Sequence, residues 1–171
     1  MLGVGAAGAA AAGLTALAVV LWLANRAADG LDGAVARTRG RVTDGGAYLD
    51  IVADVVVYAV VPLGVAVHID ARATWIATAV LLATFYVNTI SWTYLAALLE
   101  RRAVGADAGA ESTSVTMPPG LVEGAETIVW FTLLLAFPSL APWWMGTMAV
   151  ATSLGAAVRV RSGLRSLGGA P

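Results

Sequence analysis

Residues 74–99 read TWIATAVLLATFYVNTISWTYLAALL, an uncharged run long enough to cross a membrane as one helix. A membrane-spanning helix needs about 20 predominantly apolar residues. Working outward from this run, four further apolar segments meet or approach that length: residues 5–24, 46–67, 125–138 and 143–158. The last two are short, and Pro138 and Pro142 predict a turn between them. The sequence therefore predicts an all-α polytopic transmembrane helix bundle of about five spans, forming a single domain over residues 1–171.

The composition supports a lipid-facing protein. Hydrophobic residues make up 59% of the 171 residues, against about 45–50% in soluble domains. Charged residues make up only 12%, and the net charge of −1 argues against nucleic acid as a partner. The chain has no cysteine, which excludes disulfides and thiolate metal sites.

The arginines predict the orientation in the membrane. With five spans, one side of the membrane holds residues 26–45, 100–124 and 159–171, which contain nine of the ten arginines. Only Arg72 lies on the other side. Because basic loops remain in the cytoplasm, we expect the C-terminus inside the cell and the N-terminus outside it.

Four aspartates fall at the cytoplasmic end of the first two predicted spans. Asp50 and Asp54 lie inside a span, where a carboxylate costs about 2.5–3.5 kcal/mol, and their i, i+4 spacing places them on one helix face. Asp29 and Asp32, spaced i, i+3, share a face if the first helix continues through them. Carboxylates that repel one another are compensated by hard divalent cations such as Mg²⁺ or Mn²⁺, and four suffice for two ions. Pairing with nearby arginines is the alternative, and it is strongest for Asp29 and Asp32.

The spacing of these aspartates resembles one family. The chain reads Asp29-Gly-Leu-Asp32-Gly33-Ala-Val-Ala36-Arg37, then eight residues, then Gly46-Ala-Tyr-Leu-Asp50-Ile-Val-Ala-Asp54. It meets all eight fixed positions of D-x-x-D-G-x-x-A-R-x8-G-x3-D-x3-D, the signature of the CDP-alcohol phosphatidyltransferases. The flanking Asn25-Arg26-Ala-Ala-Asp29 and Gly120-Leu-Val-Glu123-Gly-Ala-Glu126-Thr look like an uncharacterised bacterial branch of that family.

The resemblance implies a reaction of phospholipid biosynthesis. An acceptor hydroxyl would attack the lipid-side phosphorus of a CDP-alcohol such as CDP-diacylglycerol, and CMP would leave. By analogy, the metal ligands are Asp29, Asp32, Asp50 and Asp54, and Asp54 is also the general base. The residues implied for binding the CDP-alcohol are Gly33, Ala36, Arg37 and Gly46. The expected partners are the CDP-alcohol lipid, a small alcohol acceptor and membrane lipids, and a homodimer is carried over from the family.

The chain departs from the family at its N-terminus. Family members usually have six spans, and here one predicted span precedes Asp29, so we expect an N-terminal truncation that removes the first helix. An inactive or partner-dependent membrane protein is therefore an alternative, and a small cation transporter is another.

Two weaker signals come from the later spans. Arg101 and Arg102 could bind an acceptor phosphate or serve only topology and headgroup contact. Asn88, Thr89, Ser91 and Trp92 add polarity to the third predicted span, and we expect them to form interhelical hydrogen bonds.

Overall fold

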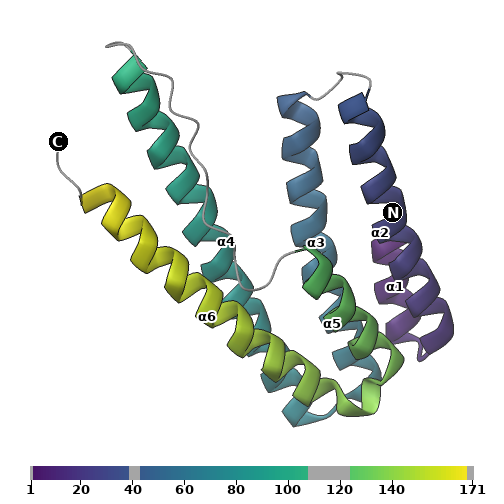
Figure 1. Cartoon of the computed structure of the whole chain (residues 1–171). Helices are drawn as coiled ribbons and strands as arrows, with labels where there is room; N and C mark the ends of the chain where they lie inside the picture. The colour runs from purple at the N-terminus through teal and green to yellow at the C-terminus, as the bar shows by residue number, and fades with distance from the viewer. Residues whose placement is uncertain (1, 39–42, 108–123, 169–171) are drawn as a thin grey trace.

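The computed structural model describes residues 2–38, 43–107 and 124–168, and all regular structure within them is helical. This confirms the predicted all-α class. In chain order (Figure 1) the elements are α1 (Leu2–Ala11), α2 (Thr15–Thr38), α3 (Asp44–Ile69), α4 (Arg72–Asp107), α5 (Gly124–Ala136), the short 3-10 helix η1 (Pro138–Leu140) and α6 (Ala141–Gly168).

The first predicted span, residues 5–24, is wrong as a continuous helix. The chain turns at Gly13, whose φ of 74° lies in the left-handed region that glycine adopts without steric cost. α1 then lies antiparallel to α2, and Asn25 Oδ1 accepts a hydrogen bond of 3.0 Å from the Gly3 N–H. An uninterrupted run of alanine and glycine has the same hydropathy whether the helix bends or not. A separate short helix, α1, therefore precedes α2, the helix that carries Asp29. This corrects the expectation of one continuous helix before Asp29.

The number of long apolar helices is also lower than predicted. Among the described residues, Tyr48–Ile69 and Arg72–Arg102 are long and apolar enough to cross a membrane. The pair Ala125–Ala136 and Pro138–Gly168, bent by 108°, raises the count to three at most. Any stretch of α2 long enough to cross includes Arg26, Asp29 and Asp32. The predicted break between the last two segments is confirmed, since α5 ends just before Pro138.

An aromatic cluster joins four helices below the aspartates. The Trp22 ring of α2 stacks on Phe131 of α5, with centroids 5.0 Å apart. Tyr58 of α3 and Phe85 of α4 lie 5.5 and 6.3 Å from the same Phe131 ring. Trp22 and Phe131 are fully buried. This cluster, defined by Trp22, Tyr58, Phe85 and Phe131, joins the helices about one turn along α3 from Asp54, between the aspartates and the closed end of the molecule.

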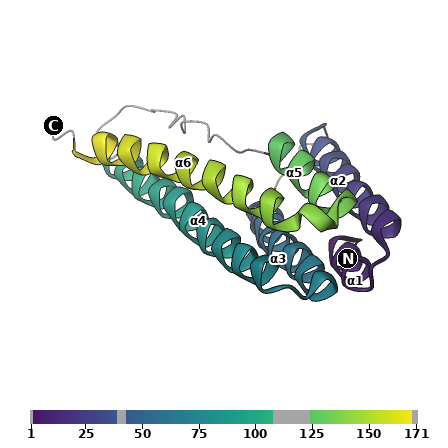
Figure 2. The ribbon, with the colours of Figure 1, turned by 90° about the horizontal axis from the view of Figure 1, so that it is seen from below.

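The helices form two groups, α1 to α3 on one side and α4 with α6 on the other, which separate above this cluster. α1 packs closely on α3, because Gly64 presents no side chain to the Ala7 carbonyl. α4 and α6 pack along each other, and Gly163 lies against Leu95 at their contact. In Figure 1 the α4–α6 pair diverges from α2 and α3 toward the end where α2 stops and α3 begins, and Figure 2 shows the two groups from below. The molecule thus opens at the end that carries the aspartates.

Candidate active site

The start of α3 is fixed by a helix cap. Thr43 is the N-cap residue, and its Oγ1 accepts a 3.2 Å hydrogen bond from the Gly46 N–H. This satisfies one of the free N–H groups of the first turn. Gly46 is exposed beside Thr43. The cap sets the register in which Asp50 and Asp54 follow, one and two turns further along α3.

Aspartates from two helices meet at the open end of the molecule. Asp29 of α2 and Asp54 of α3 both contact the Arg26 guanidinium, and Asp29 lies close enough to Asp50 and Asp54 for their charges to act on it. α2 continues as a helix to Thr38, so its backbone places Asp32 one turn after Asp29. The side chains of Asp32, Gly33, Ala36 and Arg37 lie outside the described part of the chain. The structure therefore places three of the four predicted metal ligands, Asp29, Asp50 and Asp54, near one another. The fourth, Asp32, lies on α2, the helix that carries Asp29.

Arg26 is the residue of this site that sequence reasoning missed. Its Nη2 lies 2.7 Å from Asp54 Oδ1, and its Nη1 lies 3.6 Å from Asp29 Oδ2. Nη1 also donates to the Tyr58 hydroxyl at 3.3 Å, and the guanidinium lies 5.2 Å from the Trp22 ring centroid. The Arg26 side chain is only 8% exposed. The sequence assigned it to membrane orientation, although its place one helical turn before Asp29 was a usable signal.

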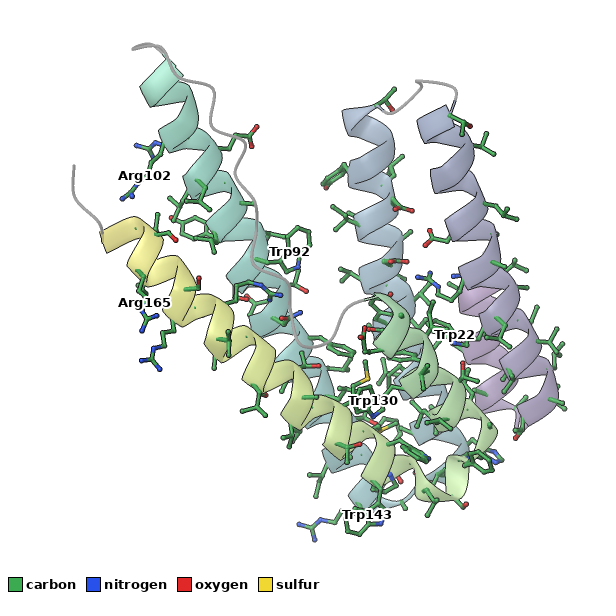
Figure 3. The ribbon with its side chains drawn as sticks, viewed as in Figure 1. Trp22, Trp92, Arg102, Trp130, Trp143 and Arg165 are labelled. Carbon is green, nitrogen blue, oxygen red and sulfur yellow. The ribbon has the colours of Figure 1, made fainter. Side chains whose placement is uncertain are left out.

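The bundle has two large cavities, with volumes of about 870 and 710 Å³. Asp54 lines the smaller one. The 710 Å³ cavity lies between α3 and α4, with Asp54 and Tyr58 on the α3 side. The α4 side supplies Phe85, Asn88, Thr89 and Trp92, among others, and α5 and α6 add Thr127 and Thr152. Figure 3 shows Trp92 projecting from α4 into the space toward α3. The lining is mainly apolar with a few polar groups, which is typical of ligand sites.

Polar groups behind this cavity connect α4 to α6. Arg159 Nη1 donates to Asn88 Oδ1 at 2.7 Å and to Ser91 Oγ at 3.5 Å. The interhelical hydrogen bonds expected of Asn88 and Ser91 are thereby confirmed. Arg159 was assigned only to orientation, because nothing in the sequence shows which helix it faces.

Arg101 and Arg102 lie at the far end of α4, and both are exposed. Arg102 donates to the Ser166 and Leu167 carbonyls at 3.5 and 3.0 Å, so it caps the last turn of α6. Binding of an acceptor phosphate by either arginine stays a prediction.

The donor set of the site suits a hard cation. Asp29, Asp50 and Asp54 offer only carboxylate oxygens, the ligands that Mg²⁺ and Mn²⁺ prefer. Among the side chains that the structure describes, no group of three is arranged to hold an ion. Asp54 is engaged by Arg26, and Asp32 is not among those side chains. The described carboxylates therefore suit a divalent ion in the chemical type of their oxygen donors.

Comparison with known proteins agrees with the signature. The family model described as CDP-alcohol phosphatidyltransferase matches residues 2–157. The inner membrane protein YnjF of Escherichia coli (strain K12) is 38% identical over 122 residues, which cover 71% of the chain and 58% of that relative. The chain thus spans little more than half the length of this curated relative. No solved structure gives a significant match.

Proposed function

The chain belongs to the CDP-alcohol phosphatidyltransferase family, and from this premise we propose that it transfers a substituted phosphate group from a CDP-alcohol to an alcohol acceptor, releasing CMP. The observation that carries the proposal is the meeting of Asp29, Asp50 and Asp54 beside a cavity of about 710 Å³. The proposed donor is a membrane lipid such as CDP-diacylglycerol, and the acceptor is a small alcohol.

Metal binding is part of the proposal. The residues proposed to hold two Mg²⁺ or Mn²⁺ ions are Asp29, Asp32, Asp50 and Asp54. A bound ion of this kind would neutralise phosphate charge and polarise the bond that breaks. The residues proposed to make room for the CMP portion are Gly33, Ala36 and Gly46, on the two helix segments that flank residues 39–42. Arg37 is proposed to bind a phosphate of the CDP-alcohol or to pair with the nearby carboxylates.

Asp54 is the proposed general base. It lines the cavity, and Arg26 fixes one of its carboxylate oxygens. In the proposed step the acceptor oxygen bonds to the lipid-side phosphorus, and the bond from that phosphorus to the CMP oxygen breaks. The acceptor proton passes to Asp54, and CMP carries away the electron pair. Arg26 is a positioning residue in this scheme, because it acts through Asp54.

The fold supports access by a lipid. The cavity between α3 and α4 is lined largely by apolar side chains, with Asp54 and Ile51 on its α3 side. A lipid-linked donor can therefore approach Asp54 sideways from the bilayer. We place the end that carries the aspartates on the cytoplasmic side of a bacterial inner membrane, as the arginine distribution favours.

The test is a CMP-release assay on purified protein. We expect release with CDP-diacylglycerol, Mg²⁺ or Mn²⁺ and at least one acceptor from a panel of alcohols and alcohol phosphates. Asp54→Asn should abolish release while leaving membrane insertion intact. Asp70→Asn is the matched control, since Asp70 caps the far end of α3 and asparagine tolerates its left-handed conformation. Unchanged turnover in Asp54→Asn would remove the proposed base.

Metal removal is a separate test. Chelation with EDTA should abolish CMP release, and added Mg²⁺ or Mn²⁺ should restore it. Adding Ca²⁺ instead tests whether the site needs a small ion with octahedral geometry, because Ca²⁺ is larger and binds more oxygen ligands. Full activity in EDTA would contradict the metal part of the proposal. Absence of CMP release under every condition would favour the inactive or partner-dependent alternative.

A further inference from the structure

A second groove, with a volume of about 870 Å³, runs between α4 and α6 on the surface of the molecule. On α4 it is lined by Val80, Ala83, Thr84 and Val87, whose spacing places them on one helix face. On α6 it is lined by Ser153, Ala156, Ala157, Val160, Arg161, Leu164 and Arg165. The valines and Leu164 are about half exposed or more, so the apolar lining faces outward.

This groove, called the α4/α6 groove below, is separate from the cavity beside Asp54. The two share no lining residue. On α4 the cavity uses Leu82, Phe85 and Thr89, which lie on a different face from Val80 and Val87. A ligand in the α4/α6 groove would therefore not reach the aspartates.

Positive charge lies at one end of the groove. Arg161 and Arg165 are spaced i, i+4, both are exposed, and neither has an ion-pair partner among the described residues. Figure 3 shows Arg165 on the side of α6 that faces away from α3. Among the side chains that the structure describes, none that lines the groove is acidic. Two unpaired guanidinium groups at the end of an apolar channel are complementary to a ligand with an apolar body and an anionic head.

The length of the groove matches one leaflet. From Ser153 to Arg165 the α6 helix rises about 18 Å at 1.5 Å per residue. Half of the hydrocarbon core of a bilayer is about 15 Å thick. An acyl chain lying along Val160 and Ala157 would therefore place its headgroup at the level of Arg161 and Arg165.

We propose that the α4/α6 groove binds a membrane phospholipid with an anionic headgroup. One acyl chain lies in the apolar channel between α4 and α6. Arg161 and Arg165 bind the headgroup phosphate, since basic pockets between helices at a membrane surface are suited to anionic lipids. The site is independent of the proposed transfer reaction.

The experiment uses the whole protein in nanodiscs that contain equal amounts of phosphatidylglycerol and phosphatidylcholine. Retained lipids are counted by native mass spectrometry after release from the disc. The wild type should retain phosphatidylglycerol in preference to phosphatidylcholine. Arg161→Gln with Arg165→Gln should reduce that retention roughly 10- to 30-fold, from the contribution of two basic residues. Arg72→Gln is the control, since Arg72 is exposed and lies outside the groove.

A second variant tests the apolar channel with both arginines in place. Ala157→Leu fills the groove with a larger side chain and should also lower phosphatidylglycerol retention. Equal retention in the wild type and in both groove variants would overturn the proposal. Displacement of the lipid by millimolar glycerol phosphate would also overturn it, because the site would then be one for free phosphate.

The remaining alternative is that a second copy of the chain covers the groove. The native sequence has no cysteine, so Ala157→Cys introduces a single reactive thiol. Under the proposal, this variant should not form disulfide-linked dimers in the membrane. Efficient cross-linking would make the groove an interface between copies and would contradict lipid binding there.

Discussion

Arg26 makes three kinds of interaction at once: ion pairs, a hydrogen bond and a contact with an aromatic ring. Its guanidinium pairs with Asp54 and Asp29, donates to Tyr58 and lies against the Trp22 ring. Removing one partner of a buried ion pair leaves the other charge without compensation, which costs about 3–5 kcal/mol. Asp54 remains 30% exposed, so water offsets part of that cost.

The first prediction concerns Arg26→Gln. We expect a decrease of about 3 kcal/mol in the free energy of unfolding, measured by denaturation in detergent. We also expect a lower kcat with little change in KM for the donor, since Arg26 orients Asp54 and does not contact the lipid. Arg26→Lys should recover part of the stability, because lysine keeps the charge but cannot form the same fork or stack.

Arg72→Gln is the control for this prediction. Arg72 is exposed at the start of α4, so its replacement should change the free energy of unfolding by no more than about 0.5 kcal/mol. Equal effects of the two substitutions would show that the Arg26 interactions contribute nothing.

Tyr58→Phe separates the hydroxyl from the ring. The ring contacts with Trp22 and Phe131 remain, while the acceptor for Arg26 Nη1 is lost. We expect a loss of about 1 kcal/mol in the free energy of unfolding and a smaller loss of CMP release than in Arg26→Gln. A loss of activity as large as that of Asp54→Asn would assign the hydroxyl a direct role.

Individual elements differ in how well the sequence revealed them. The spacing of the signature residues correctly predicted that Asp50 and Asp54 share one helix face. It also predicted that the helix before Asp29 continues past this residue, because residue types at fixed intervals can be read from a sequence. The turn at Gly13 was not predicted, because the hydropathy of a segment does not depend on the backbone φ of one residue. The partners of Arg26 and Arg159 could not be predicted either, because each lies on another helix.

The packing of α1 on α3 gives a prediction at this scale. A Cβ at Gly64 would collide with the backbone carbonyl of Ala7, which cannot move as a side chain can. Gly64→Ala should therefore lower the free energy of unfolding by about 1–3 kcal/mol, measured by thermal unfolding in detergent.

Gly8→Ala is the matched control on α1. Nothing lies within 4 Å of a Cβ at this position. Because alanine favours a helix over glycine by about 0.5–1 kcal/mol, this substitution should be neutral or stabilising. The same sign for both substitutions would mean that α1 does not pack on α3 as described.

Two exposed serines report the orientation of the whole molecule. Ser139 lies in η1 at the closed end, and Ser166 lies in the last turns of α6 at the open end. In the cysteine-free chain, Ser139→Cys should react with a membrane-impermeant maleimide in intact cells. Ser166→Cys should react only after permeabilisation. The reverse pattern would place the aspartates outside the cell.

The two-part architecture has a mechanical consequence. α4 and α6 contact each other far more extensively than they contact the remaining helices, and α4 alone is about 54 Å long at 1.5 Å per residue. From Phe85 to its end at Asp107, α4 rises about 33 Å at 1.5 Å per residue. A 5° rotation about Phe85 and Phe131 would therefore displace this end of α4 by about 3 Å. Small adjustments among the four packed rings can therefore change the width of the opening between the two groups of helices.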